Sequence, residues 1–129
     1  MQDKFSNNIS EFLNFLHSIP SQHKLATEEL DKQEKLTQDL LHSLELDELT
    51  YKQRCKVATL LTHNRRDRRK AKDALELLTP IYEYMMDPVN KKVFDKMTDV
   101  LGETRKVEKR HTNRCYTPRV LSTEVTNGK

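Results

Sequence analysis

The chain has 129 residues, of which 33% are charged and 35% are apolar, with only two Gly, four Pro and no Trp. This length predicts one domain with a modest core, and the composition favours long amphipathic helices over sheets. No apolar window is long enough for a membrane span, the first residues lack the apolar stretch of a signal peptide, and the two cysteines form no CxxC pair. We therefore expect a cytoplasmic protein with free thiols.

The net charge of +3 is distributed unevenly along the chain. Residues 1–50 carry four Lys or Arg and ten Asp or Glu, which gives −6, whereas residues 51–129 carry 19 and ten, which gives +9. Two oppositely charged halves attract each other when the chain folds back on itself, and the surplus positive charge attracts an anionic partner. The expected partner is therefore an acidic protein surface, or DNA or RNA.

The first 45 residues contain two helical patterns separated by a proline. Apolar residues recur at helical spacing up to Ile19, and Pro20 is expected to end that helix. A second apolar stripe follows, so we predict helices at residues 5–18 and 21–45. The first helix, which contains three phenylalanines, is expected to dock on the core, and the alternative is an apolar patch for a partner or for dimerisation. The three phenylalanines are Phe5, Phe12 and Phe15.

A helix at residues 50–86 is expected to organise the chain. Thr50 and Gln53 form a capping-box pattern, and the next Gly or Pro is Pro80, which is expected to bend or break the helix. Because the connection to the preceding helix is short, the two are predicted to pack as an antiparallel, coiled-coil-like hairpin. Folding this hairpin brings three polar positions of the stripes to one level, where a buried polar layer fixes register. These positions are Gln33, Thr37 and Asn64.

The densest charge in the chain lies between His63 and Lys72, where six Lys or Arg accompany one Asp. At about 100° per residue, four of these cations fall away from the apolar stripe, whereas Arg68 lies at its edge, within reach of Glu28 and Asp31. Such a run is ordinarily a solvated helix face, and the alternative is contact with an anionic partner. The four candidate contact residues are Arg65, Arg66, Arg69 and Lys70.

A further helix is predicted at residues 88–109, because Asp87 and Pro88 form a strong start signal. Gly102 either weakens this helix or is followed by a charged extension. Residues 1–110 are thus expected to form a single helical domain, and residues 111–129 an extended or partly disordered basic tail. Candidate contacts to a partner or to phosphate in this region are Arg105, Lys106, Lys109, Arg110, Arg114, Tyr116 and Arg119, of which the tyrosine is suited to stacking on a base.

The sequence contains no motif of a catalytic, metal or cofactor site. Its five histidines show no HExxH or Cys/His quartet spacing, and two glycines cannot build a phosphate-binding loop. No catalytic serine or cysteine context occurs, and no helix-turn-helix, zinc-finger or RNA-recognition signature is present. We therefore expect a non-enzymatic protein without a cofactor or metal. Any nucleic-acid binding would be driven by phosphates rather than by base readout.

Three segments form a recognisable combination: TQDLLHSLE at residues 37–45, RRDRRKAKD followed by ELL within residues 65–78, and YTPRV at residues 116–120. Together they resemble small helical proteins encoded by phages and prophages of Firmicutes, over roughly residues 10–121. The resemblance brings no assigned activity, so no functional residue is carried over from it. It implies a phage accessory protein in the host cytoplasm that binds and modulates or inhibits a host or defence factor.

These observations predict an all-α protein built on a helical hairpin, with flanking helices and an extended basic C-terminal tail. The expected function is protein binding through the basic helical face and the tail. The alternative is a nucleic-acid-binding protein that recognises phosphates without sequence preference. Because long hairpins leave apolar positions exposed, we also expect a homodimer.

Overall fold

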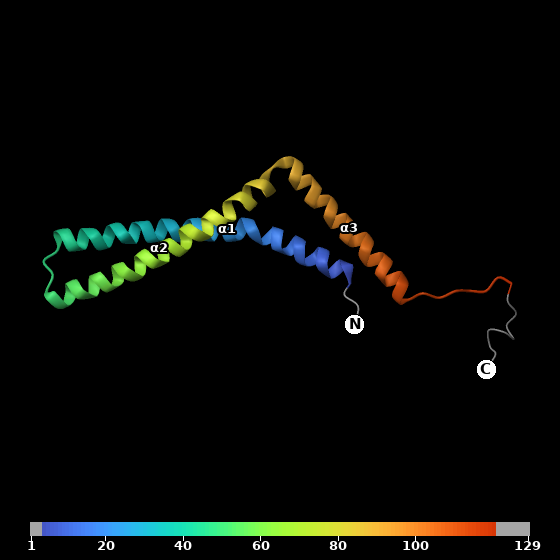
Figure 1. The fold of residues 1–129 in the computed structure, drawn as a ribbon, viewed down its shortest axis with the longest axis horizontal. Helices are drawn as coiled ribbons and strands as arrows, with labels where there is room; N and C mark the ends of the chain where they lie inside the picture. The colour runs from blue at the N-terminus through green and yellow to red at the C-terminus, as the bar shows by residue number, and fades with distance from the viewer. Residues whose placement is uncertain (1–3, 121–129) are drawn as a thin grey trace, which may run out of the picture.

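The computed structural model describes residues 4–120, which fold into three long helices joined by short connections (Figure 1). Helix α1 spans Phe5–Leu46, α2 spans Tyr51–Met86 and α3 spans Pro88–Thr112. The all-α prediction is confirmed, and residues 113–120 form neither helix nor strand. The rest of the predicted tail, residues 121–129, lies outside the described residues. None of these three helices is long and apolar enough to cross a membrane.

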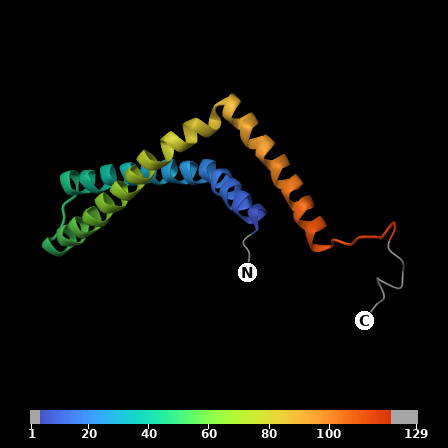
Figure 2. The ribbon, with the colours of Figure 1, turned by 45° about the vertical axis from the view of Figure 1, so that its right-hand side comes forward.

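Helices α1 and α2 lie side by side in opposite directions and form the predicted hairpin (Figures 1 and 2). The capping box at the start of α2 is also confirmed. The Thr50 N–H donates to Oε1 of Gln53 at 2.9 Å, and the Gln53 N–H donates to Oγ1 of Thr50 at 3.2 Å. Because a helix start leaves its first amides without helical partners, these two bonds define where the connection ends and α2 begins.

Helix α1 is continuous over 42 residues, so the prediction that one helix ends at Pro20 and another begins there is wrong. The proline removes the backbone donor for the carbonyl of Leu16, and Figure 2 shows that α1 bends within its N-terminal half. The helix nevertheless continues, because Leu16, Ile19 and Ala26 on either side of the proline are all buried. Burial of this stripe offsets the roughly 3 kcal/mol that an interior proline costs.

Helix α2 likewise continues through Pro80, so the predicted bounds of 50–86 hold and the helix is not broken there. At its end, the Asp87 carboxylate accepts a hydrogen bond of 2.9 Å from the Val89 N–H and caps α3 as predicted. Helix α3 passes through Gly102 without interruption and ends at Thr112, three residues beyond the predicted end.

The main apolar core lies near the corner where α2 gives way to α3, at the open end of the hairpin. The His23 ring stacks on the Tyr82 ring there, with centroids 4.2 Å apart and planes 6° from parallel. The buried members of the core are Leu16, Ile19 and Met85, and the residues packed against them are Leu78, Ile81, Tyr82 and Phe94.

The start of α1 contacts the end of α3, so the N-terminal part of α1 lies against α3 as well as against α2. The Ser6 N–H donates to the Glu108 carboxylate at 3.2 Å. Hydrogen bonding from Ser6, together with the nearby positive charges of Lys4 and Arg105, lowers the pKa of Glu108 below its ordinary value. The ionised form of the Glu108 carboxylate therefore favours this contact between α1 and α3.

The phenylalanines near the start of α1 are not part of the apolar core. Phe5, Phe12 and Phe15 keep 77%, 45% and 50% of their surface exposed, whereas Leu13 and Leu16 are buried. The expected docking of this helix on the core is therefore confirmed through its leucines, with Leu16 in the core itself, and the phenylalanines stay at least partly exposed.

Candidate binding surface

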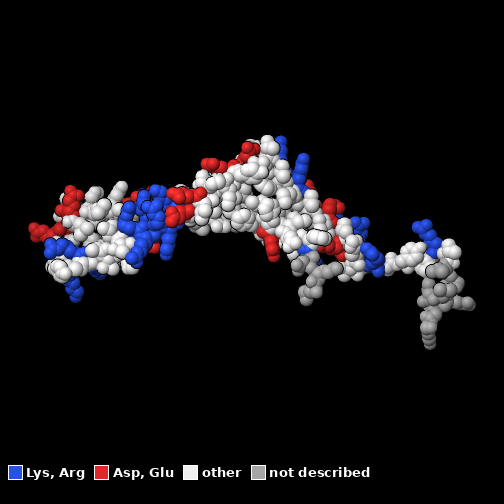
Figure 3. All heavy atoms as spheres, viewed as in Figure 1, with Lys and Arg blue, Asp and Glu red and all other residues white. Residues whose placement is uncertain are grey.

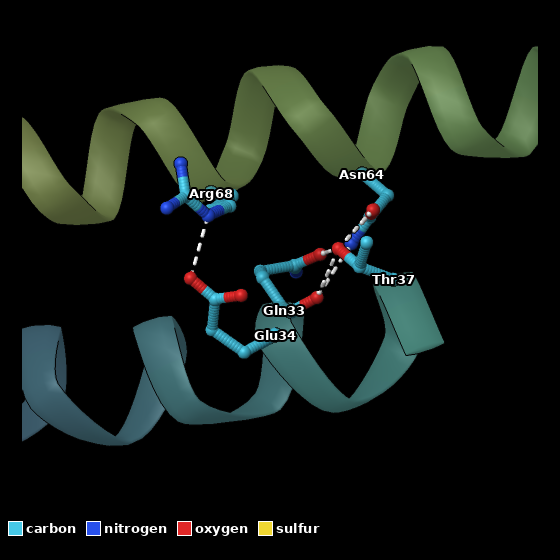
Figure 4. Close-up of polar contacts among 5 residues, drawn as sticks. All are labelled: Gln33, Glu34, Thr37, Asn64 and Arg68. Carbon is cyan, nitrogen blue, oxygen red and sulfur yellow. Dashed lines mark hydrogen bonds and ion pairs between the residues drawn. The ribbon is translucent and has the colours of Figure 1, made fainter. Parts of the chain in front are cut away.

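A buried polar layer locks the two arms of the hairpin together (Figure 4). Asn64 is 2% exposed, and its Nδ2 donates to both the side-chain and the backbone oxygen of Gln33 at 2.9 Å. The Thr37 hydroxyl donates to Oδ1 of Asn64 at 2.7 Å. Each buried polar side-chain atom in residues 4–120 has a partner, so the layer carries no desolvation penalty from an unpaired group. The predicted layer is confirmed.

A carboxylate sets the direction of this chain of hydrogen bonds. Glu29 accepts from Nε2 of Gln33 at 2.8 Å, and an ionised carboxylate can only accept. The Gln33 Oε1 must therefore accept from Nδ2 of Asn64, which leaves the Asn64 Oδ1 to accept from Thr37. The same orientation satisfies the backbone carbonyl of Gln33, so the amide of Asn64 fits in one way only.

The position of Asn64 fixes the rotation of α2 about its axis. Asn64 faces α1, and at about 100° per residue Arg65, Arg66 and Arg69 lie about 100°, 200° and 140° around the helix from it. Arg65, Arg66 and Arg69 accordingly point away from α1 and are exposed, and so is Lys70. We call these four residues the basic strip. Figure 3 shows a dense group of Lys and Arg atoms over the middle of the hairpin.

Arg68 behaves differently from its neighbours, because it lies about 40° from Asn64. Its Nε donates to Oε1 of Glu34 on α1 at 2.6 Å, and its side chain is 18% exposed (Figure 4). Internal pairing of Arg68 with α1 was predicted, but the partner is Glu34 instead of Glu28 or Asp31. No residue of the basic strip forms an ion pair with any described residue.

A second group of cations surrounds an open cavity of about 1010 Å³ at the end of α3. Lys106 forms an exposed ion pair with Glu103 at 3.4 Å, which leaves the other cations of this cavity without a carboxylate partner among residues 4–120. We call this group the α3 cation cluster. Its members are Lys106, Lys109, Arg110 and Arg114, and the remaining cavity residues are Glu103, His111, Asn113 and Cys115.

The other predicted contacts lie around this cluster but outside its cavity. Arg105 lines a separate hollow with Lys4, Ser6 and Glu108, on the side of α3 that faces α1. Tyr116 is 76% exposed, and Arg119 is also exposed. Of the eleven residues predicted as one contact surface, the structure therefore gathers four on α2 and four at the end of α3.

These two groups are far apart. The basic strip lies level with Glu34 of α1, and the end of α3 lies level with Ser6. At 1.5 Å per residue, the helix between these two levels is roughly 40 Å long. A single small ligand cannot contact both groups, whereas a protein or nucleic acid of ordinary size can.

Residues 4–120 contain no cluster of three or more His, Cys, Asp or Glu side chains that could hold a metal ion. Cys55 and Cys115 are both free and exposed. The sequence analysis missed Glu34 and the cavity around the α3 cation cluster. The Glu34 position could have been found by aligning Arg68 one turn further along α1.

Comparison with protein-family models, curated proteins and solved structures found no match to this chain.

Proposed function

We propose that this protein is a non-enzymatic binding protein, a phage accessory protein whose basic strip engages an acidic surface of a host or defence protein. The observation that carries the proposal is that neighbouring arginines differ in whether they are paired within the chain. Arg68 is paired with Glu34, whereas Arg65, Arg66 and Arg69 are exposed and have no carboxylate partner among residues 4–120. A rigid helix that presents three guanidinium groups is suited to bidentate pairing with carboxylates.

The dimensions of the strip favour a protein partner. From Arg65 to Lys70 the helix rises only about 7 Å, so the strip spans few phosphates of a nucleic acid. Exposed Asp73 flanks it on the same face of α2, and this carboxylate would repel a continuous row of phosphates. A patterned protein surface with separated carboxylates avoids that repulsion and gains specificity from it.

The proposal is tested by affinity capture from host lysate on the immobilised protein. The triple substitution R65E, R66E and R69E reverses the strip, and the matched control K91E, K92E and K96E makes the same charge change at exposed positions of α3. We expect wild type and control to retain the same discrete protein after nuclease treatment, and the strip variant to lose it. Retention of the same protein by the wild type and both variants, or recovery of nucleic acid alone, would contradict the proposal.

The α3 cation cluster supports a second candidate function, the binding of single-stranded nucleic acid. Four cations line one open cavity, and the exposed Tyr116 follows two residues after Arg114. A cationic groove beside an aromatic side chain is the usual arrangement for sequence-independent binding of single strands. Fluorescence anisotropy with a labelled oligonucleotide should show salt-dependent binding that K109E with R110E abolishes and the strip variant leaves largely unchanged.

A further inference from the structure

The hairpin of α1 and α2 leaves large apolar side chains exposed, among them Leu25, Leu36, Leu60 and Leu77. Two helices side by side have no third layer, so the sides of the hairpin stay open.

One side of the hairpin carries both a groove and exposed leucines. The groove has a volume of about 490 Å³, and the small side chains of the buried Ala26 and Ala71 leave room for it between the two helices. Its lining residues are Leu25, Ala26 and Glu29 from α1, and Asp67, Lys70, Ala71 and Ala74 from α2.

Helical spacing extends this side in both directions. Leu36 lies eleven residues after Leu25, and therefore on the same face of α1 to within about 20°. On α2, Leu60 precedes Asp67 by seven residues and Leu77 follows Lys70 by seven, so each continues a row that lines the groove. The four leucines Leu25, Leu36, Leu60 and Leu77 are 63%, 37%, 47% and 75% exposed. We call this surface the groove side.

The two arms that border the groove carry opposite charge. Residues 20–46 of α1 contain three Lys and six Asp or Glu, which gives −3, and residues 51–79 of α2 contain nine Lys or Arg and three Asp or Glu, which gives +6. Only one ion pair, Arg68–Glu34, joins the arms within the described chain. Much of the α2 charge belongs to Arg65, Arg66 and Arg69, which face away from the groove, so the charged residues that line the groove are Glu29 of α1 and Asp67 and Lys70 of α2.

We propose that the groove side seats the groove side of a second copy of this chain, with α1 of each copy lying over α2 of the other in a two-fold four-helix dimer. This arrangement sets Glu29 of each copy against the partner's Lys70, whereas the opposite two-fold arrangement sets α1 against α1 and does not bring these two side chains together. Lys70 of the basic strip also lines the groove, but the proposal does not rest on the proposed function, because the three arginines of the strip lie outside the groove side.

The register within one chain fixes which residues meet between copies. Gln33 contacts Asn64 and Glu34 contacts Arg68, so each step forward along α1 is a step backward along α2. Leu25 then lies level with the partner's Leu77, and Leu36 with the partner's Leu60. Glu29 faces the partner's Lys70, and Lys32 faces the partner's Asp67. Each pairing occurs twice, and neither Lys32 nor Asp67 has an ion-pair partner among residues 4–120.

Light scattering after gel filtration of the full chain tests the proposal. We expect twice the chain mass of 15.3 kDa for wild type, and the monomer mass for L25E with L36E. The matched control L41E with L46E places the same charges at exposed leucines on other faces of α1 and should remain dimeric. Circular dichroism confirms that the variants stay helical. A monomeric wild type, or a control that dissociates as readily as L25E with L36E, would overturn the proposal.

A charge exchange tests the orientation. Lys32→Glu and Asp67→Lys should each raise the dimer Kd by about tenfold, because each dimer contains two copies of the altered pair. The double variant should restore the wild-type Kd, since the charges are simply exchanged. If the double variant is no tighter than the single ones, α1 does not lie over α2 of the other copy and the proposed arrangement is wrong. The variant R65E, R66E and R69E should stay dimeric, which separates this result from the partner-binding test.

Discussion

Asn64 donates two hydrogen bonds to Gln33 across the hairpin, each 2.9 Å long, one to the side chain and one to the backbone. This single contact decides two things at once. It fixes how far α2 is shifted along α1, and it fixes which side of α2 faces outward. The arginines next in sequence are exposed for that reason, so a buried amide determines the geometry of a charged surface.

Replacing Asn64 by Ala is expected to lower the free energy of unfolding by about 2–3 kcal/mol, because the Gln33 Oε1 loses its donor inside the hairpin and the hydrogen bonds that join Asn64 to Gln33 and Thr37 are lost. Urea denaturation followed by circular dichroism measures the change. Thr62→Ala, at an exposed position of the same helix, serves as the control and should shift the free energy by less than about 0.5 kcal/mol. Equal effects at the two positions would show that the layer does not form.

Replacing the whole layer by apolar residues should have a different outcome. In the variant Q33L, T37V and N64L, no buried polar group is left unpaired, so the unfolding free energy should recover to at least the wild-type value. The hairpin should then lose its unique register, because apolar contacts permit neighbouring alignments. Broadened or doubled NMR signals for residues of α1 and α2 would report that loss. Sharp, single signals would mean that register is set elsewhere.

The sequence predicts the hairpin, both α2 and α3 start signals and the polar layer, because each depends on local spacing or on a short connection. It does not predict the continuity of α1. Pro20 is unfavourable locally, and only the buried stripe on both sides of it, a tertiary effect, keeps the helix intact. Similarly, the sequence analysis placed Arg68 within reach of Glu28 and Asp31, whereas the structure pairs it with Glu34, about one turn further along α1. Local spacing does not fix the shift of one helix along the other to within a turn, because side-chain packing sets that shift.

Pro20→Ala should stabilise the protein. The substitution restores the hydrogen bond to the Leu16 carbonyl and removes the clash of the ring with the preceding turn, which together cost up to about 3 kcal/mol. Part of this is offset because proline also restricts the unfolded chain, so we expect a gain of about 1–2 kcal/mol in thermal or urea denaturation. Pro88→Ala, at the first position of α3 where proline is tolerated, should change stability little. A loss of stability in P20A would indicate that the bend itself is needed for packing.

The contact between Ser6 and Glu108 should depend on pH. Because the folded state lowers the Glu108 pKa from its ordinary value of 4.5, the contact stabilises the fold above pH 4.5 and its contribution is lost as the pH falls through the lowered pKa. An NMR titration should show the Ser6 amide shifting with a midpoint below 4.5. The shift should disappear in E108Q and persist in the control E103Q. A midpoint above 4.5 would mean that Ser6 does not stabilise the carboxylate.

The Arg68–Glu34 ion pair should contribute only modestly to stability. Although its Nε–Oε1 distance is 2.6 Å, the Glu34 side chain is 44% exposed, and solvent screens the attraction. A double-mutant cycle of Arg68→Met and Glu34→Gln should give a coupling free energy of about 1 kcal/mol or less. The same cycle on Lys35 and Asp31, an exposed pair one turn apart, should give a smaller value. A larger coupling for the exposed pair would contradict the inward placement of Arg68.

Arginine-specific labelling with phenylglyoxal, read by mass spectrometry, tests most directly whether the polar layer turns the basic strip outward. Arg65, Arg66 and Arg69 should react rapidly, and Arg68 should react slowly because its side chain is 18% exposed and bonded to Glu34. Unfolding in urea should make all four react alike. Equal reactivity of Arg68 and its three neighbours in the folded protein would contradict the account, and so would protection of the strip with rapid labelling of Arg68.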